Sequence, residues 1–221
     1  IVKQTGGYIF PDSTPGKAIL KITVDEGQPY RVGTFDVIGN RRFSADELSL
    51  FFPFGLGVVG GRGREGGVPF SRAEWEAATE KVRNHYSNFG YILSQVEPEE
   101  VRRTGPDGKP IVDLKWKVYE GQPATINKII IVGNDITHER VIREQIVLLP
   151  GMTFNRDALI RSYQNVSNLN FFEQPIPSPG VDQAENGVDV DVTFRVTEKN
   201  TGNINFGASV GQGVGVGGFL G

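Results

Sequence analysis

The fold of this chain is decided by a stretch that occurs twice. Residues 118–123 read Val-Tyr-Glu-Gly-Gln-Pro and are followed at residues 129–134 by Ile-Ile-Ile-Val-Gly-Asn. An earlier copy reads Val-Asp-Glu-Gly-Gln-Pro at residues 24–29 and ends in Val-Ile-Gly-Asn at residues 37–40. The copies lie 94 residues apart (120 − 26 and 133 − 39). This period is too long for a solenoid unit and indicates tandem small domains.

The segment between the two copies predicts the order strand, helix, helix, strand, strand. Alternating apolar and polar residues indicate strands at residues 32–38, 91–101 and 112–118. Ser44 and Ser71 each stand three residues before a glutamate, a capping-box pattern that marks the start of a helix. We therefore expect a small sheet whose helices cover one side.

The segment after the second copy repeats this order. Strands are expected at residues 126–132, near Gln174 and at residues 188–196. Thr137 and Asn155 are the expected N-caps of its two helices. Prolines next to Gln174 remove backbone donors, so the strand expected there should pair poorly.

Three stretches lie outside this pattern. Residues 1–27 end in an alternating run that indicates the last part of a preceding domain. Residues 55–67 are a glycine-rich insertion, for which we expect an exposed, mobile loop without a ligand. Residues 200–221 alternate as a strand of a membrane β-barrel does, and an ordinary strand or a glycine-rich tail is the alternative. The apolar positions of this strand are Ile204, Phe206, Ala208 and Val210.

The composition argues against several functions. Hydrophobic residues make up 38% of the chain and charged residues 22%, which suits ordinary small cores. The formal net charge is −3 without a basic cluster, which argues against nucleic-acid binding. The chain has no cysteine, its two histidines lack partners at metal-ligand spacing, and no serine lies in a nucleophile elbow. We therefore expect no catalytic site, no metal and no cofactor.

The two segments resemble POTRA (polypeptide-transport-associated) domains. The likeness rests on the strand and Gly-Asn corner at residues 35–40 and 129–134, the helix end at residues 88–92 and the link at residues 149–155. Residues 196–202 resemble the passage from the last POTRA domain into the barrel in the BamA family of outer-membrane protein assembly factors. The resemblance implies an α+β fold of tandem β-α-α-β-β domains, each a three-stranded mixed sheet with two helices on one face.

The resemblance also implies domain borders and a function. Residues 1–27 would end a preceding POTRA domain, residues 28–121 and 122–199 would be two POTRA domains, and residues 200–221 would begin the barrel. Such a region is a periplasmic receptor and scaffold at the Gram-negative outer membrane. It binds unfolded outer-membrane protein precursors and docks accessory outer-membrane lipoproteins. The POTRA region of a two-partner secretion or other translocation pore is the alternative.

An outer strand of the first sheet is the expected binding site for unfolded precursors. An extended segment can add to a free sheet edge through backbone hydrogen bonds, with little demand on its sequence. We expect the side chains of Leu93 and Gln95 on the outer face of this strand. The residues expected to begin the edge strand are Tyr91, Ile92, Leu93, Ser94, Gln95 and Val96.

The first helix of the last domain is the expected docking surface for accessory lipoproteins. Arg140, Arg143 and Glu144 lie beside its apolar stripe. Since the final domain of this family meets accessory proteins, the resemblance implies that these charges take part in docking. An ordinary solvated helix face is the alternative, because exposed charges usually contribute little binding energy.

Overall fold

The computed structural model describes residues 3–9, 19–25, 28–55, 68–199, 206–211 and 215–220, and it places side chains in 28–55 and 68–199. The chain divides into two compact units. The first includes Leu93–Gly121 and the residues up to Ser87, and the second includes Asn88–Ile92 and the residues from Gln122. Most of the predicted glycine-rich loop, residues 56–67, lies outside the described residues.

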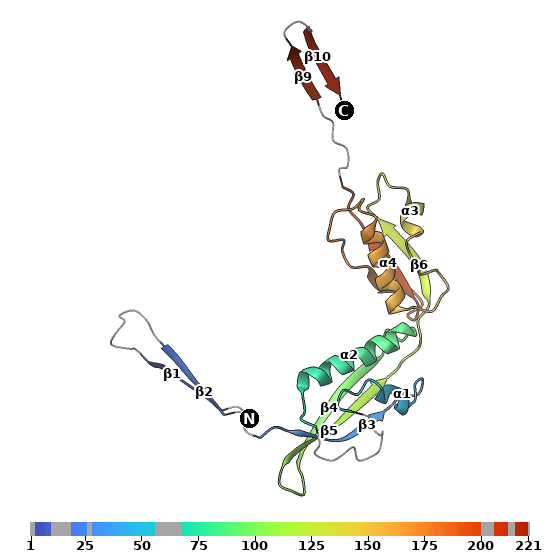
Figure 1. The fold of residues 1–221 in the computed structure, drawn as a ribbon. Helices are drawn as coiled ribbons and strands as arrows, with labels where there is room; N and C mark the ends of the chain where they lie inside the picture. The colour runs from blue at the N-terminus through green and yellow to red at the C-terminus, as the bar shows by residue number, and fades with distance from the viewer. Residues whose placement is uncertain are drawn as a thin grey trace. The chain divides into compact units, whose positions relative to one another are not determined.

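The first unit is built on a three-stranded mixed sheet with the order β3-β5-β4 (Figure 1). The central strand β5 (Pro110–Tyr119) runs parallel to β3 (Arg31–Ile38) and antiparallel to β4 (Gln95–Thr104). The helices α1 (Ala45–Ser49) and α2 (Arg72–Asn88) lie between β3 and β4 in the chain. The predicted order of elements and the α+β fold are confirmed.

Aromatic side chains form the centre of the first core. Trp75 on α2 and Trp116 on β5 stack with ring centroids 4.9 Å apart, and the ring of Phe35 meets the edge of Trp116 at 5.1 Å. The buried Thr79 hydroxyl accepts a hydrogen bond from Trp116 Nε1 at 2.9 Å and donates one to the Trp75 carbonyl at 2.9 Å. Helix and sheet are thus joined by stacking and by a satisfied buried polar group.

The second unit repeats this topology. Its sheet has the order β6-β8-β7, with β8 (Val190–Arg195) in the centre. The outer strands are β6 (Ile126–Val132), which is parallel to β8, and β7 (Gly180–Gln183), which is antiparallel. The helices are α3 (Glu139–Arg143) and α4 (Arg156–Asn168). Asn155 caps α4 as predicted, since its side-chain oxygen accepts from the Ala158 amide at 2.7 Å.

A close backbone approach explains the repeated Gly-Asn corner. Gly39 has φ = 84°, and a Cβ there would lie 2.2 Å from the carbonyl oxygen of Val118. Gly133 has φ = 93°, and its Cβ would lie 2.0 Å from the carbonyl oxygen of Val196. Both the positive φ and the lack of space require glycine. Each corner therefore places the end of the first strand directly against the end of the central strand.

The fourth strand of the chain begins later than the sequence predicts. It starts at Gln95, so Tyr91, Ile92, Leu93 and Ser94 form the turn before it rather than part of the strand. The reason is that this turn is held in the second unit. The Gly90 carbonyl accepts from the Ala124 amide at 2.9 Å, and Ile92 packs against the second core.

The strand expected near Gln174 also lies elsewhere. The strand in this position is β7 (Gly180–Gln183), and the prolines at 175 and 177 precede it. Ile176 is buried in the second core, and its carbonyl accepts from the Tyr163 hydroxyl at 2.8 Å. Since proline cannot donate to a ladder, pairing begins only after this segment.

The two ends of the chain form short antiparallel pairs. β1 (Lys3–Ile9) pairs with β2 (Ile19–Asp25), and β9 (Phe206–Gly211) pairs with β10 (Gly215–Leu220). Phe206, Ala208 and Val210 lie on β9, while Ile204 lies outside the described residues. The domains assigned to both ends stay predictions. Among the helices in the described ranges, none combines the length and the apolar character that a membrane-spanning segment needs.

The close backbone contact at Gly133 predicts that an alanine there costs more stability than an alanine at another glycine with positive φ. Gly133→Ala should destabilise the second unit by about 2–5 kcal/mol, because strain at positive φ and overpacking against Val196 add up. Gly151 is the matched control, since it has φ = 85° with nothing within 4 Å of its missing Cβ. Gly151→Ala should cost about 1–2 kcal/mol for strain alone. Urea unfolding of both variants measures the difference, and equal losses would contradict the role assigned to the corner.

Candidate functional site

The outer edge of β4 carries backbone groups that point away from β5 at every second residue. At the hairpin after β4, the Gly105 amide donates to the Lys109 carbonyl at 2.8 Å. Thr104 is the next residue on β4, and it pairs with Pro110, which has no N–H. In an antiparallel ladder this places the amide and carbonyl of Thr104 on the side away from β5. The even-numbered residues of β4 therefore point their backbone groups outward.

The second half of this edge is open. Glu100, Arg102 and Thr104 each present an outward amide and carbonyl, whereas Pro98 lacks the amide. Within the described residues, β4 has a ladder with β5 and with no other strand. A ten-residue outer strand with a run of unpaired groups is a ready template for a further strand.

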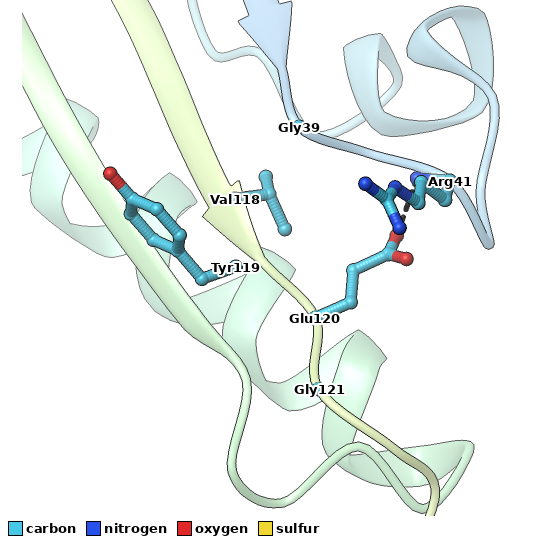
Figure 2. Close-up of a pocket in the computed structure, with 6 residues that line it drawn as sticks. All are labelled: Gly39, Arg41, Val118, Tyr119, Glu120 and Gly121. Carbon is cyan, nitrogen blue, oxygen red and sulfur yellow. Dashed lines mark hydrogen bonds between the residues drawn. The ribbon is translucent and has the colours of Figure 1, made fainter.

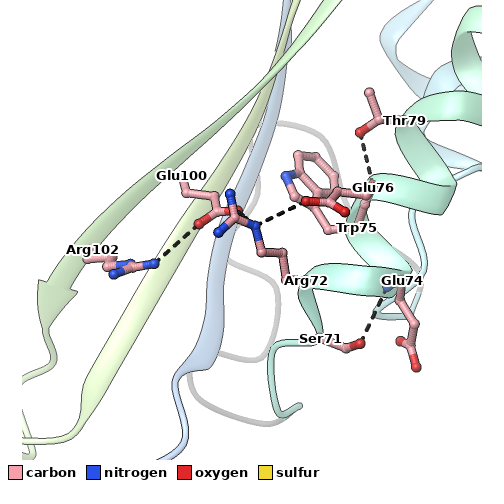
Figure 3. Close-up of polar contacts among 8 residues, drawn as sticks. All are labelled: Ser71, Arg72, Glu74, Trp75, Glu76, Thr79, Glu100 and Arg102. Atoms are coloured by element: carbon pink, nitrogen blue, oxygen red, sulfur yellow. Dashed lines mark hydrogen bonds and ion pairs between the residues drawn. The ribbon is translucent and has the colours of Figure 1, made fainter. Parts of the chain in front are cut away.

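Paired charges flank this edge on the helix side (Figure 3). Arg72 at the start of α2 lies 3.1 Å from Glu76 and 3.9 Å from Glu100 on β4. Arg102 lies 3.6 Å from the other oxygen of Glu100. Figure 3 shows Arg72 between the helix and the strand, with Glu100 between the two arginines. These contacts tie α2 to β4 through side chains and do not involve the outward backbone groups of Glu100, Arg102 and Thr104.

The open face of the sheet carries a second set of ion pairs. Lys117 on β5 lies 3.0 Å from Glu99 on β4, and the hydrogen bond between them lowers the pKa of Glu99 and raises the pKa of Lys117. Arg103 Nε lies 2.5 Å from Asp113. Between these two pairs, Val101 is an apolar side chain with 48% of its surface exposed. Val101 is therefore the contact position on this face for a strand added to β4.

The other edges of the two sheets are less available. The Val32 amide on β3 donates to the Val68 carbonyl at 2.9 Å, and the Ile126 amide on β6 donates to the Met152 carbonyl at 2.8 Å. β7 has four residues, and its Asp182 pairs directly opposite Asp191. A strand of four residues presents fewer outward backbone groups than the ten residues of β4. Of the two strands, β4 therefore offers more backbone groups for pairing with a further strand than β7 does.

The predicted docking charges lie together on α3 and the residue after it. Arg140 Nε lies 2.8 Å from Glu144, and Arg143 pairs with Glu139 and donates to the Ile129 carbonyl at 3.4 Å. Arg140 is the most accessible of the three predicted residues, with 87% of its side chain exposed. Arg143 is tied to the body of the unit, so Arg140 and Glu144 are the better candidates for a contact with a partner.

A glutamate at the end of each central strand is a structural element that the sequence reasoning missed. Glu120 accepts hydrogen bonds from the amides of Arg41 and Arg42 at 2.7 and 2.8 Å and from the Tyr86 hydroxyl at 2.9 Å. Figure 2 shows its carboxylate turned toward the backbone of Arg41, beside a hollow of about 470 Å³. Because the loop already occupies this carboxylate, the hollow is part of the corner.

Glu198 holds the equivalent loop in the second unit. It accepts from the amides of Ile136 and Thr137 at 2.9 and 2.5 Å. The predicted N-cap at Thr137 is wrong: the N-cap of α3 is His138, which makes no side-chain capping bond, and the Thr137 side chain bonds to Glu198 instead. The signal in the sequence was a glutamate shortly after each central strand. Over the described residues, no group of three or more metal-ligating side chains occurs.

The strand-end glutamate predicts a loss of stability in acid. Hydrogen bonds, first from the Thr137 side chain and then from its amide, hold the pKa of Glu198 below its usual value of 4.5. The stabilisation is complete above that value and is lost as the pH falls through the lower pKa of the folded state. Glu198→Gln should therefore be less stable than the native chain at pH 7, and the gap should narrow toward pH 3. Thermal melts at pH 7, 5, 4 and 3 measure this gap, and a constant gap would contradict the assignment.

Comparisons with known proteins agree with this architecture. The chain matches the POTRA family, described as surface antigen variable number repeat, over residues 30–121 and 124–199. It is 28% identical over 90% of its length to a candidate outer membrane protein assembly factor of Treponema pallidum. It is 25% identical over 87% of its length to the outer membrane protein assembly factor BamA of Buchnera aphidicola. The chain spans 22% and 29% of these two relatives.

Solved structures show the same fold. POTRA domains 3–5 of Haemophilus influenzae BamA match 89% of this chain, and 72% of that chain is covered. The TM-score is 0.64 at 18% sequence identity. BamA of Haemophilus ducreyi without POTRA domains 1–3 gives the same TM-score at 22% identity, with 85% of this chain and 33% of that chain covered. Since the family match extends over most of the chain, this protein belongs to the POTRA family.

Proposed function

We propose that this chain is a periplasmic receptor and scaffold of an outer-membrane protein assembly machine, and that it has no catalytic role. Its curated relatives are named as outer membrane protein assembly factors, which supports this setting. The observation that carries the proposal is the ten-residue outer strand β4, whose second half pairs on its outer side with none of the strands that the structure describes. An unfolded outer-membrane protein precursor, here called the client, adds a strand to this edge.

The chemistry of this edge suits a receptor for many different clients. Backbone amides and carbonyls are the same in every client, so pairing makes little demand on sequence. Each such bond contributes about 1 kcal/mol net, so a short added strand binds weakly and leaves readily. The charged side chains on both faces of β4 are already paired with one another, so they restrict few side chains of the client. A receptor that accepts many different clients and then releases them requires binding that is weak, reversible and tolerant of sequence.

The second unit supplies the scaffold function in this proposal. Arg140 and Glu144 present an exposed pair of opposite charges on and beside α3. A partner with a complementary pair can orient itself on this surface, because charged contacts at a rim fix register and speed encounter. The partners proposed for this surface are accessory outer-membrane lipoproteins.

Site-specific crosslinking tests the choice of edge. A photo-crosslinker at Val101 on β4 should capture a urea-unfolded porin more strongly than one at Asp182 on β7. The two positions are equivalent, since they pair with Asp113 and Asp191 of the central strands. The long open edge explains the expected difference, and the measurement is the yield of crosslinked product on a gel. Equal or stronger capture at Asp182 would reject β4 as the receiving edge.

A proline at an outward position separates backbone pairing from side-chain contact. Arg102→Pro removes an outward amide without removing a ladder bond, in the way that Pro98 already does. It should lower capture at Val101 about fivefold, the effect of one lost hydrogen bond. Arg102→Ala is the control, because it removes the same side chain and keeps the amide. Equal losses in the two variants would show that the side chain, and not the backbone, binds the client.

A charge reversal tests the docking surface. Arg140→Glu should reduce co-purification of accessory lipoproteins with the full-length protein from outer membranes. The unit should stay folded, because an exposed ion pair contributes at most about 1 kcal/mol. Arg161→Glu makes the same change of charge at an exposed position of α4 and should leave co-purification unchanged. Unaltered recovery with Arg140→Glu would count against a docking role for α3.

A further inference from the structure

One side chain of α2 covers a backbone group at the edge of β4. Arg83 donates to the Val96 carbonyl from Nη2 at 2.7 Å and from Nε at 3.2 Å, and its Nη1 pairs with Glu80 on the same helix. Val96 is an even-numbered residue of β4, so its carbonyl points away from β5. The Arg83 guanidinium therefore occupies the acceptor that an added strand would use at the start of the edge.

The next outward position strengthens this block. Pro98 has a carbonyl but no N–H, so it offers an added strand one bond instead of two. The edge thus has two parts, a guarded half at residues 95–98 and an open half at residues 99–104. In the guarded half one of the two outward carbonyls is occupied and one of the two outward amides is missing.

The surroundings of Arg83 allow it to be displaced. A hollow of about 410 Å³ adjoins the guarded half, lined by Glu76, Ala77, Thr79, Glu80, Arg83 and Pro98. Arg83 is 42% exposed and Glu80 is 60% exposed, so the guanidinium can leave Val96 and remain paired with Glu80 and with water. When Arg83 leaves the carbonyl, no charge is therefore left buried and unpaired. An unpaired buried charge would be costly.

The second unit lacks an equivalent of this arrangement in its described residues. The N-caps Ser71 and Asn155 are 84 residues apart (155 − 71), which places Ser167 of α4 at the position of Arg83. The Ser167 hydroxyl is buried and makes no hydrogen bond. The short strand β7 has no long edge to protect. The arginine thus occurs in the unit with the long outer strand. This is expected if its role is to limit the pairing of other strands with that edge.

We propose that Arg83 is an edge guard that decides which half of β4 a client strand pairs with. The client pairs first with the open half, and it reaches Val96 only by displacing Arg83. The inference rests on the proposed function, since it concerns the same edge. As a consequence, the client pairs with a short segment of β4 in one defined register. Without Arg83, a strand of ten residues would allow several registers.

Crosslinking at two positions tests the guard. The probe is a peptide with the sequence of residues 203–211, acetylated and amidated, which alternates as a strand does and carries no charge. Photo-crosslinkers are placed at Glu97 in the guarded half and at Val101 in the open half, in otherwise native protein and in R83M. The native protein should give capture at Val101 and at least fivefold less at Glu97. R83M should raise capture at Glu97 about fivefold, the effect of one recovered hydrogen bond.

Controls separate the guard from loss of charge and from failure of the proposed function. K81M removes a charge at an exposed position of the same helix and should leave the ratio of Glu97 to Val101 capture unchanged. R83A should act as R83M does, which excludes an effect of the methionine side chain. Capture at Val101 with an unaltered ratio in R83M and R83A would overturn the guard alone. No capture at either position in any variant would overturn the proposed function together with the guard.

Discussion

Both units depend on one backbone contact, in which the glycine that ends the first strand lies against a carbonyl at the end of the central strand. Gly39 meets Val118 and Gly133 meets Val196 at distances that exclude any side chain. The chain can then turn sharply into the first helix, whose preceding loop is held by Glu120 or Glu198. The parallel pairing of the first and central strands ends at this point, so the contact fixes where the helices begin.

The features that could be predicted from the sequence are those with local causes. Ser44 and Asn155 cap helices because their side chains reach amides three residues away. The strands β5 and β8 were predictable because each is buried on one face and alternates accordingly. The Gly-Asn corners were visible as a repeat, although their cause, a contact with a strand about 63–79 residues away, was not.

Two of the features that were mispredicted have causes far away in the chain. The residues around Ile92 alternate like a strand, but Ile92 belongs to the core of the second unit, and alternation cannot report which core a residue enters. Thr137 is of a residue type that often caps helices, but its side chain and its amide both donate to a glutamate 61 residues later. The role of Arg83 was equally hidden, because an arginine on a solvated helix face gives no sign that it reaches a carbonyl of a strand.

The stacked pair of tryptophans has a spectroscopic consequence. Trp75 and Trp116 are the two tryptophans of the chain, and both lie in the first unit at 4.9 Å from each other. Indole emission and the near-ultraviolet circular dichroism of the stacked rings therefore report on the first unit alone. Peptide-bond absorbance reports on both units. Tryptophan fluorescence can therefore follow the unfolding of the first unit separately from that of the second.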